Sequence, residues 1–298
     1  MSHVALVTDS TASLPSDVAE KHGIIVVPLQ VVIGAKSYDE GVEGGATAAT
    51  VADALREWRP VSTSRPTPAA MLEVYEKAAD AGAIEIVSVH LSSELSGTYE
   101  SAQLAARQSP VPVVTVDSRQ LGMATGFAVI SAAETLAEGG SAERAAEVVR
   151  RRTADTTSLF SIDTLEYLRR GGRIGAAAAL LGSALSVKPL LKLENGRIGM
   201  LEKVRTAGRA LSRLEELAVG AAGDRSVDLA VAHLANPERA ELLATNLRER
   251  LAANLEDRDV VVGEVGAVIG AHVGPGMVAV MVSPRPQRED GASLSTAD

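Results

Sequence analysis

The chain has 298 residues, a formal net charge of −9, and a composition that is 46% hydrophobic but only 2% aromatic. The negative charge and the scarcity of aromatic platforms argue against a nucleic-acid partner. The absence of cysteine excludes disulfides, thiolate metal sites and cysteine nucleophiles. The length suffices for one large domain or two ordinary ones, with a core built from Ala, Val, Leu and Ile.

Short apolar strands alternate with helices over the first half of the chain. The expected strands are 3–10, 23–33, 84–90 and 111–118. Helices are expected over 15–22, over 47–58, from Pro68 to Gly82 and over 122–139. A further helix is expected to follow the strand 84–90 and to end at Arg107. This alternation predicts crossover connections and a parallel sheet, so the first domain is expected to be an α/β domain covering residues 1–157.

The pattern changes after about residue 157. A strand leading into a short helix is expected over 158–175, and Asn195-Gly196 predicts a hairpin over 188–205. A helix over 206–222, a strand over 226–235, a helix over 237–253 and closing strands over 259–283 follow. Hairpins beside helices predict an α+β second domain over 158–283, and the polar, Pro-rich residues 284–298 are expected to form a disordered tail.

The N-terminus has no basic segment followed by a long apolar core, so a signal peptide is not expected. The longest apolar stretch is too short to span a bilayer. We therefore expect a cytoplasmic protein without stable membrane insertion.

A hydroxyl-rich segment, Ser92 to Thr98, follows the strand 84–90 and precedes a helix. Unpaired N–H groups and the positive dipole end make a helix N-terminus favourable for anions. The anion could be a phosphate or a carboxylate, or the hydroxyls could only cap the helix. Other hydroxyl-rich segments also follow expected strands, and ligands of open α/β sheets bind at that edge.

Thr63 and Ser64 could converge with Ser93 and Ser96 on one anion, or they could simply belong to the loop before the helix that Thr67 caps. His272 lies beside Gly274-Pro275-Gly276, where it could be structural or could donate to an anion.

Arg169, Arg170 and Arg173 flank Gly171-Gly172, where they could bind phosphate or an acidic partner, or complement a helix dipole. Asp9 could act as an acid or base or a metal ligand, although a turn-capping role is favoured. The other histidines show no metal-ligand spacing, so no metal site is expected. The chain also lacks a phosphate-binding loop, a G-x-G-x-x-G after the first strand and a G-x-S-x-G elbow.

Taken together, the segments resemble the DegV family over essentially the whole chain to about Val282. The blocks that carry the resemblance occur in the family's order: TDSTASLP (8–15), TSRPTP (63–68), SSELSGTYESA (92–102), VDSRQLGMATG (116–126), DTLEYLRRGGRIG (163–175), KPLLKLENGRIGMLEKVRT (188–206) and HVGPGMVAV (272–280). The resemblance implies two α/β domains with a tunnel between them that holds one long-chain fatty acid. It further implies that the protein is not itself an enzyme and has no cofactor beyond the bound acid. A separate fatty acid kinase would phosphorylate the presented carboxylate for phospholipid synthesis.

The resemblance also implies roles for individual residues. Thr63 and Ser96 would hold the carboxylate, His272 would be a further contact, and Ser93 and Ser64 would be neighbours. Arg173 and Arg170 would contact the kinase. The family's usual TSQPSP is TSRPTP here, which places Arg65 near the headgroup.

Two other functions stay open at this point. A hydrolase or phosphotransferase would use Asp9, Ser93, Ser96 and His272 as a loose triad-like set, without an elbow motif for the nucleophile. A structural or regulatory binding module would hold no lipid.

Overall fold

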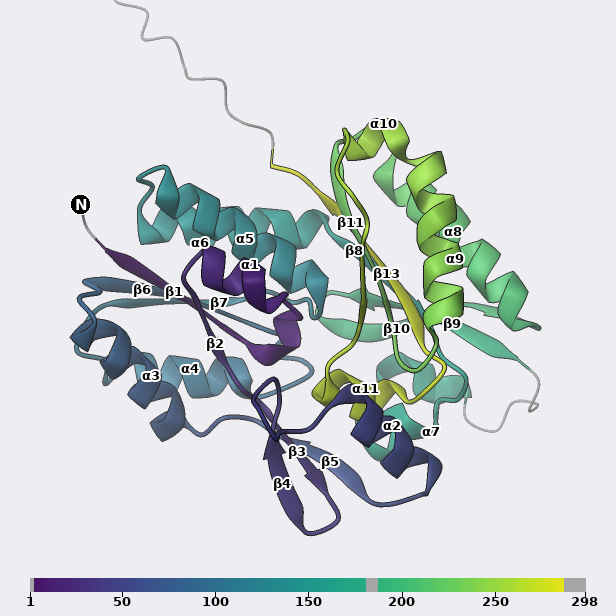
Figure 1. Ribbon diagram of the computed structural model, residues 1–298, viewed down its shortest axis with the longest axis horizontal. Coiled ribbons are helices and arrows are strands. Elements are labelled where there is room, and N and C mark those ends of the chain that lie inside the picture. Colours follow the sequence, from purple (N-terminus) through teal and green to yellow (C-terminus); the bar gives the residue numbers. More distant parts are fainter. Residues whose placement is uncertain (1–2, 181–186, 287–298) are drawn as a thin grey trace, which may run out of the picture.

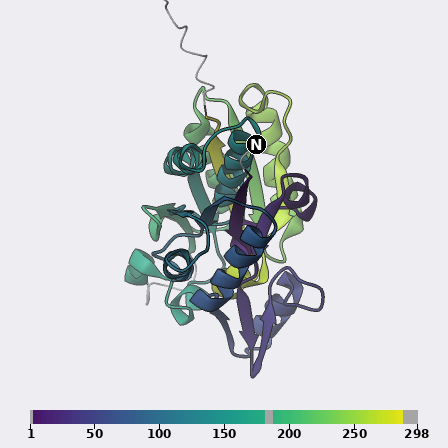
Figure 2. The ribbon, with the colours of Figure 1, turned by 90° about the vertical axis from the view of Figure 1, so that its left-hand side faces the viewer.

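The structure, a computed structural model, describes residues 3–180 and 187–286. Over this part of the chain the strands form a four-stranded, a six-stranded and a three-stranded sheet. Figure 1 shows the two larger sheets in separate halves of the molecule, with the three-stranded sheet projecting below; Figure 2 shows the same projection from the side. The predicted mixed α/β architecture is confirmed.

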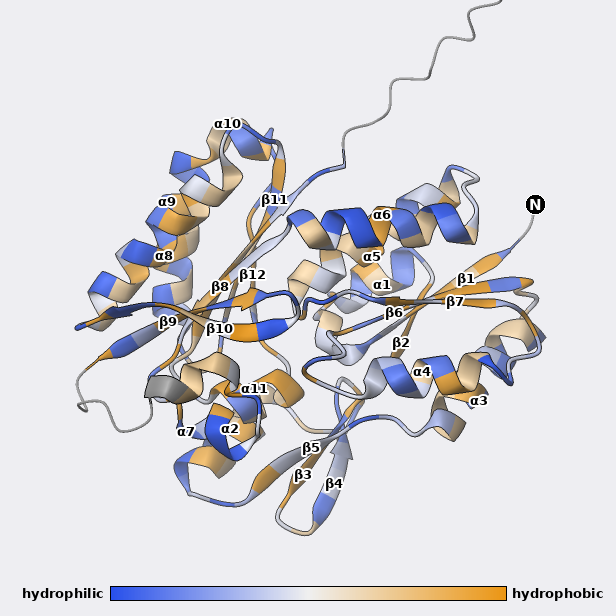
Figure 3. Ribbon diagram, turned by 180° about the vertical axis from the view of Figure 1, so that it is seen from behind, coloured by the Kyte–Doolittle hydropathy of each residue, from blue (hydrophilic) through white to orange (hydrophobic). Residues whose placement is uncertain are grey.

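The four-stranded sheet is entirely parallel and has the order β2-β1-β6-β7. Its strands are β1 (Val4–Asp9), β2 (Ile24–Val27), β6 (Glu85–His90) and β7 (Val113–Asp117). Both faces are covered, because α3 (Pro68–Asp80) and α4 (Thr98–Ala106) pack on one side and α5 (Met123–Ala137) and α6 (Ala142–Asp155) on the other. Double coverage explains why β1 and β6 are buried at successive positions rather than at alternating ones. In Figure 3 the strands are mainly hydrophobic, whereas α6 carries many hydrophilic residues.

Two features of this half differ from the sequence prediction. The expected single strand over 23–33 is interrupted at Pro28, which lacks an N–H, and it continues as a strand of a different sheet. The segment 140–157, for which no element was predicted, contains α6, whose N-terminus is capped by the Ser141 hydroxyl.

The three-stranded sheet is antiparallel, with the order β4-β3-β5. It consists of β3 (Gln30–Ile33), β4 (Lys36–Asp39) and β5 (Val61–Ser64). Thr63 and Ser64 therefore lie within a strand, not in a loop after a strand of the main sheet as expected. Helix α2 (Ala48–Arg56) connects β4 to β5 and begins at Thr47, which forms a capping box with Thr50.

The six-stranded sheet has the order β10-β9-β8-β13-β11-β12, and only β12 pairs with its neighbour in parallel. Its strands are β8 (Thr157–Ser161), β9 (Lys188–Glu194), β10 (Arg197–Val204), β11 (Val227–His233), β12 (Val261–Glu264) and β13 (Val278–Pro284). The predicted hairpin is confirmed between β9 and β10. Asn195 and Gly196 both have positive φ, as the two-residue hairpin turn requires.

Helices α8 (Ala207–Ala222), α9 (Pro237–Arg250) and α10 (Ala252–Leu255) cover the outer face of this sheet. Helices α7 (Glu166–Arg170) and α11 (Ala267–Val273) lie toward α2 and the small sheet. The prediction of strands across 259–283 is wrong over α11. Its β-branched residues resemble a strand, but Gly266 and Gly274 bound a short buried helix, with Gly274 at φ 73°.

The predicted boundary at residue 157 stays a prediction, although β8 begins there. Of the expected tail, Pro284 ends β13 and the Arg285 N–H donates to the Ser226 carbonyl, whereas residues 287–298 lie outside the described part. Within residues 3–180 and 187–286, none of the helices has the length and apolar character needed to cross a membrane.

Candidate functional site

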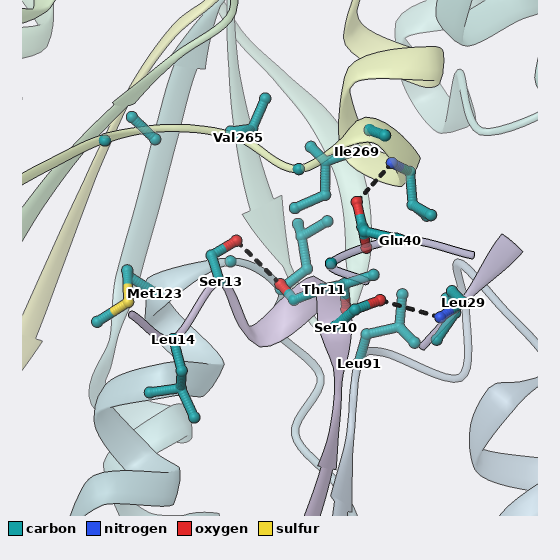
Figure 4. Close-up of a pocket in the computed structure, with 18 of the residues that line it drawn as sticks. Ser10, Thr11, Ser13, Leu14, Leu29, Glu40, Leu91, Met123, Val265 and Ile269 are labelled. Atoms are coloured by element: carbon teal, nitrogen blue, oxygen red, sulfur yellow. Dashed lines mark hydrogen bonds between the residues drawn. The ribbon is translucent and has the colours of Figure 1, made fainter. Parts of the chain in front are cut away.

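A cavity of about 1330 Å³ lies between the two halves. One wall comes from β2 and the loops after β1 and β6, and the other comes from β12, β13 and α11. Figure 4 shows that aliphatic side chains dominate its surface. Those labelled there are Leu14, Leu29, Leu91, Met123, Val265 and Ile269. A largely apolar cavity of this size is suited to an aliphatic ligand.

Thr63 and His272 form the polar centre at one end of the cavity. The Thr63 Oγ1 lies 2.9 Å from the His272 Nε2, and both residues line the cavity. Strand β5 carries Thr63, and the last turn of α11 carries His272. The structure therefore brings together two of the predicted site residues from distant segments.

The environment of His272 favours one tautomer of the neutral ring. The Nδ1 atom is buried and has no hydrogen-bond partner among the described residues. It packs against the Gly171 backbone so closely that a Cβ on that glycine would lie 2.1 Å away. A proton on Nδ1 would be an unpaired buried donor, so the proton is expected on Nε2, where it can be donated to Thr63.

Burial, reinforced by the positive charge of Arg173, lowers the pKa of His272 to about 4. The ring is therefore neutral at pH 7. If His272 Nε2 donates to Thr63 Oγ1, the Thr63 hydroxyl proton remains available for a ligand oxygen. The pair thus offers a polarised O–H donor without burying a full positive charge.

Ser96 lines the same cavity, in the turn before α4. Its hydroxyl lies 2.9 Å from the Thr98 Oγ1 and accepts from the Thr98 N–H, so it also caps the helix in place of Gly97. The predicted helix-mouth position of Ser96 is confirmed. Ser92 has a different role, because its buried hydroxyl donates to the Gly196 carbonyl in the β9–β10 turn.

The two neighbouring serines of the prediction behave differently. Ser64 lines the cavity, is exposed, and donates to the Arg65 carbonyl. Ser93 is exposed, lies outside the cavity lining, and donates to the Asp117 carboxylate. The expectation that Ser93 is near the anion is corrected: the chain turns after Ser92, and the next residue faces Asp117.

Arg173 belongs to the wall of the cavity. Its Nε donates to the Leu95 carbonyl at 3.0 Å, and its Nη1 donates to the Gly171 carbonyl. The side chain thereby connects the loop before α4 to the Gly171-Gly172 turn. Arg173 was expected to contact a partner protein, and the structure shows that it also lines the cavity.

Arg170 lies outside the cavity lining, on the surface of α7. It pairs with Glu166 at 2.7 Å, and its guanidinium carbon lies 4.9 Å from the centroid of the exposed Trp58 ring. An exposed arginine beside an exposed tryptophan is a composition common in protein interfaces.

Arg65, the departure from the family pattern, is already paired. Its Nη1 donates to the Gly97 carbonyl and to Glu100 at 2.9 Å. The added positive charge therefore fastens β5 to the start of α4, with its own counter-charge supplied by Glu100.

The triad-like set of the hydrolase alternative is not assembled. Asp9 is buried and bonded to His90 and to the Leu91 N–H. The other ring nitrogen of His90 is hydrogen-bonded to the Ser88 hydroxyl, which also accepts from the Tyr75 hydroxyl. All three side chains are buried. Asp9 thus orders the carboxyl ends of β1 and β6, while His272 pairs with Thr63.

One lining residue, Glu40, was not identified from the sequence. Its carboxylate accepts from the Val268 N–H at 2.8 Å, at the start of α11. A lone glutamate in the glycine-rich segment after β4 carries no sequence signal for this position. Among residues 3–180 and 187–286, no group of three or more His, Cys, Asp or Glu side chains is arranged to hold a metal ion.

Comparisons with known proteins agree with this geometry. A family model described as an uncharacterised protein of the DegV family matches residues 3–285. A DegV domain-containing protein of Streptomyces coelicolor is 54% identical over 95% of this chain and 99% of its own length.

Solved structures give the same result. A DegV family protein of Thermus thermophilus, described for its fatty acid binding, superposes with a TM-score of 0.88 at 34% identity, covering 95% of this chain and 99% of its own. DegV of Bacillus subtilis, described as a fatty acid binding protein, has a TM-score of 0.84 at 32% identity, covering 96% and 100% of the two chains.

Proposed function

This chain belongs to the DegV family, and we propose that it binds one long-chain fatty acid in the cavity between its two halves. The observation that carries the proposal is the Thr63–His272 pair in the lining of a largely apolar cavity. The fatty acid binding described for the structural relatives from Thermus thermophilus and Bacillus subtilis supports it.

The carboxylate would lie at Thr63, His272 and Ser96, with its tail among the aliphatic side chains. The Thr63 hydroxyl would donate to one carboxylate oxygen, and the Ser96 hydroxyl, which also lines the cavity, would donate to the other. Each buried methylene contributes about 0.8 kcal/mol, so a sixteen-carbon tail has a gross gain on the order of 10 kcal/mol before association costs.

We further propose that the protein presents the carboxylate to a separate fatty acid kinase in the cytoplasm. The exposed Ser64 and Arg65 line the cavity beside Thr63, so the headgroup end is near the surface. The chain has no phosphate-binding loop, and a carboxylate is a competent phosphoryl acceptor when it is positioned. The kinase would transfer the γ-phosphoryl group of ATP to the carboxylate, giving an acyl phosphate and ADP for phospholipid synthesis.

Native mass spectrometry of the purified protein tests the binding step. The expected spectrum contains a complex heavier than the chain by the mass of one fatty acid, and denaturation with solvent extraction releases that acid. Delipidated protein should regain the complex when palmitate is added. A protein that stays ligand-free under both conditions would refute the proposal.

A further inference from the structure

The cavity contains a second polar position, formed by Glu40 and Ser10, away from the Thr63–His272 pair. Glu40 is only 5% exposed and lines the cavity. Its Oε1 accepts from the Val268 N–H, but its Oε2 is buried and has no partner among the described residues. Figure 4 shows Glu40 near Ser10, Leu29 and Ile269.

Glu40 is held rigidly in this place. Its backbone N–H donates to the Leu29 carbonyl, and its carboxyl group packs against Gly266, where a Cβ would lie 2.2 Å from Oε1. A side chain fixed in this way cannot turn to solvent to satisfy its second oxygen. A buried polar atom without a partner destabilises the protein, so a partner supplied from outside the chain would be stabilising.

The surroundings of Glu40 disfavour its charged form. Burial raises its pKa and the negative charge of Asp9 adds to the rise, while hydrogen bonds from Ser10 and the Val268 N–H oppose it. The Ser10 hydroxyl oxygen accepts from the Leu29 N–H at 3.0 Å, so its own proton can be donated to the Glu40 carboxyl group or to a ligand. A carboxyl oxygen beside a hydroxyl thus offers an acceptor and a donor to a small polar group.

We propose that Glu40 and Ser10 form a subsite for a hydroxyl group on the acyl chain, so that the protein selects hydroxylated fatty acids. This inference rests on the proposed fatty acid binding and adds a substrate preference to it. The ligand must be mostly aliphatic to match the largely apolar lining, and a single hydroxyl can pair with the Glu40 carboxyl oxygen that has no partner among the described residues.

The subsite is closer to the carboxylate than to the far end of the tail. Glu40 contacts Val268 in the first turn of α11, and His272 is four residues later on the same helix. Four residues correspond to about 6 Å of helical rise. We therefore expect the preferred hydroxyl in the half of the chain nearer the carboxylate.

Competition binding to the delipidated full-length protein tests this. The probes are palmitate and a series of monohydroxylated hexadecanoic acids that differ in hydroxyl position. For each protein the preference is the Kd of palmitate divided by the Kd of the hydroxylated acid. We expect the wild-type preference for one isomer, hydroxylated in the near half, to exceed that of Glu40→Leu by on the order of tenfold.

Two further variants keep the test independent of folding. Glu40→Gln retains an acceptor for the Val268 N–H and a donor for the ligand, so it should keep most of the preference. Glu76→Leu removes an exposed glutamate of α3, outside the cavity lining, and should leave the preference unchanged.

Equal preferences in the wild type and Glu40→Leu, or a preference confined to hydroxyls in the far half, would overturn the inference. In either case the binding of palmitate would still support the proposed function. If neither palmitate nor any hydroxylated acid binds to the wild type, the proposed function itself fails.

Discussion

The Thr63 Oγ1 lies 2.9 Å from the Nε2 of His272, although 209 positions separate the two residues in the sequence. The contact connects the small antiparallel sheet to a short helix of the other half. Because both residues line the cavity, a carboxylate bound there would be held by both halves at once. The predictions below follow from this pair and its neighbours.

Replacing Thr63 with Val removes the hydroxyl but keeps the branched shape. A lost hydrogen bond to a charged group costs about 1.5–3 kcal/mol, so palmitate affinity should fall roughly 10- to 150-fold. Fluorescent fatty acid displacement measures the change. Thr63→Ser retains the hydroxyl and should bind within a few-fold of the wild type; an affinity for Thr63→Val within twofold of the wild type would contradict the assignment.

The stability contributed by neutral His272 should depend on pH. Its folded-state pKa of about 4 is below the ordinary 6.5, so the unfolded chain takes up the proton first as pH falls. The contribution is fully present above pH 6.5 and is lost progressively as pH falls to 4, by about 3 kcal/mol.

Urea unfolding of the lipid-free wild type and of His272→Asn, at several pH values, measures this effect. As the solution is acidified, the free energy of unfolding of the wild type should fall relative to that of the variant. A difference that stays constant between pH 7 and pH 4 would be incompatible with a neutral buried ring.

Gly171→Ala should disturb the site through sterics alone. The backbone of Gly171 has φ −72°, which alanine tolerates, but its Cβ would lie 2.1 Å from the His272 Nδ1. Displacing the ring would break its bond to Thr63, destabilise the fold by about 1–3 kcal/mol and weaken palmitate binding. Gly208→Ala, in α8 with no atom within 4 Å of the added carbon, is the matched control and should leave binding unchanged. Wild-type affinity in Gly171→Ala would show that the ring is not held as described.

Substitutions of Arg170 and Arg173 should differ in their effect on palmitate binding. Arg173→Ala removes the bond to the Leu95 carbonyl in the cavity wall, so it should weaken palmitate binding and also kinase-dependent acyl phosphate formation. Arg170→Ala removes an exposed side chain outside the lining, so it should lower kcat/KM for the kinase and leave palmitate affinity intact.

Parallel measurements of palmitate Kd and of acyl phosphate formed with ATP and a bacterial fatty acid kinase check both variants. Unchanged palmitate affinity in Arg173→Ala would argue against its wall role. Reduced palmitate affinity in Arg170→Ala would instead place that residue within the binding site.

Local chemistry made several elements predictable. Thr67 and Pro68 start α3 and Asn195-Gly196 forms the β9–β10 turn as expected, because capping and turn geometry depend on a few adjacent residues. The alternation of strands and helices in the first half likewise indicated the parallel sheet correctly. Elements whose conformation depends on distant contacts were mispredicted. Helix α11 resembles a strand in composition, and it is a helix where it packs against α2, α7 and the small sheet.

The site divides in the same way. The polar side chains could be read from the sequence, and Thr63, Ser96 and His272 stood out through blocks whose order matches a family. Their surroundings emerged only from the fold: Ser93 faces Asp117, Arg173 lies in the cavity wall, and Glu40 reaches the cavity. A hydrogen bond or a buried contact joins segments that are far apart in the chain, and such segments meet only when the sheets have folded.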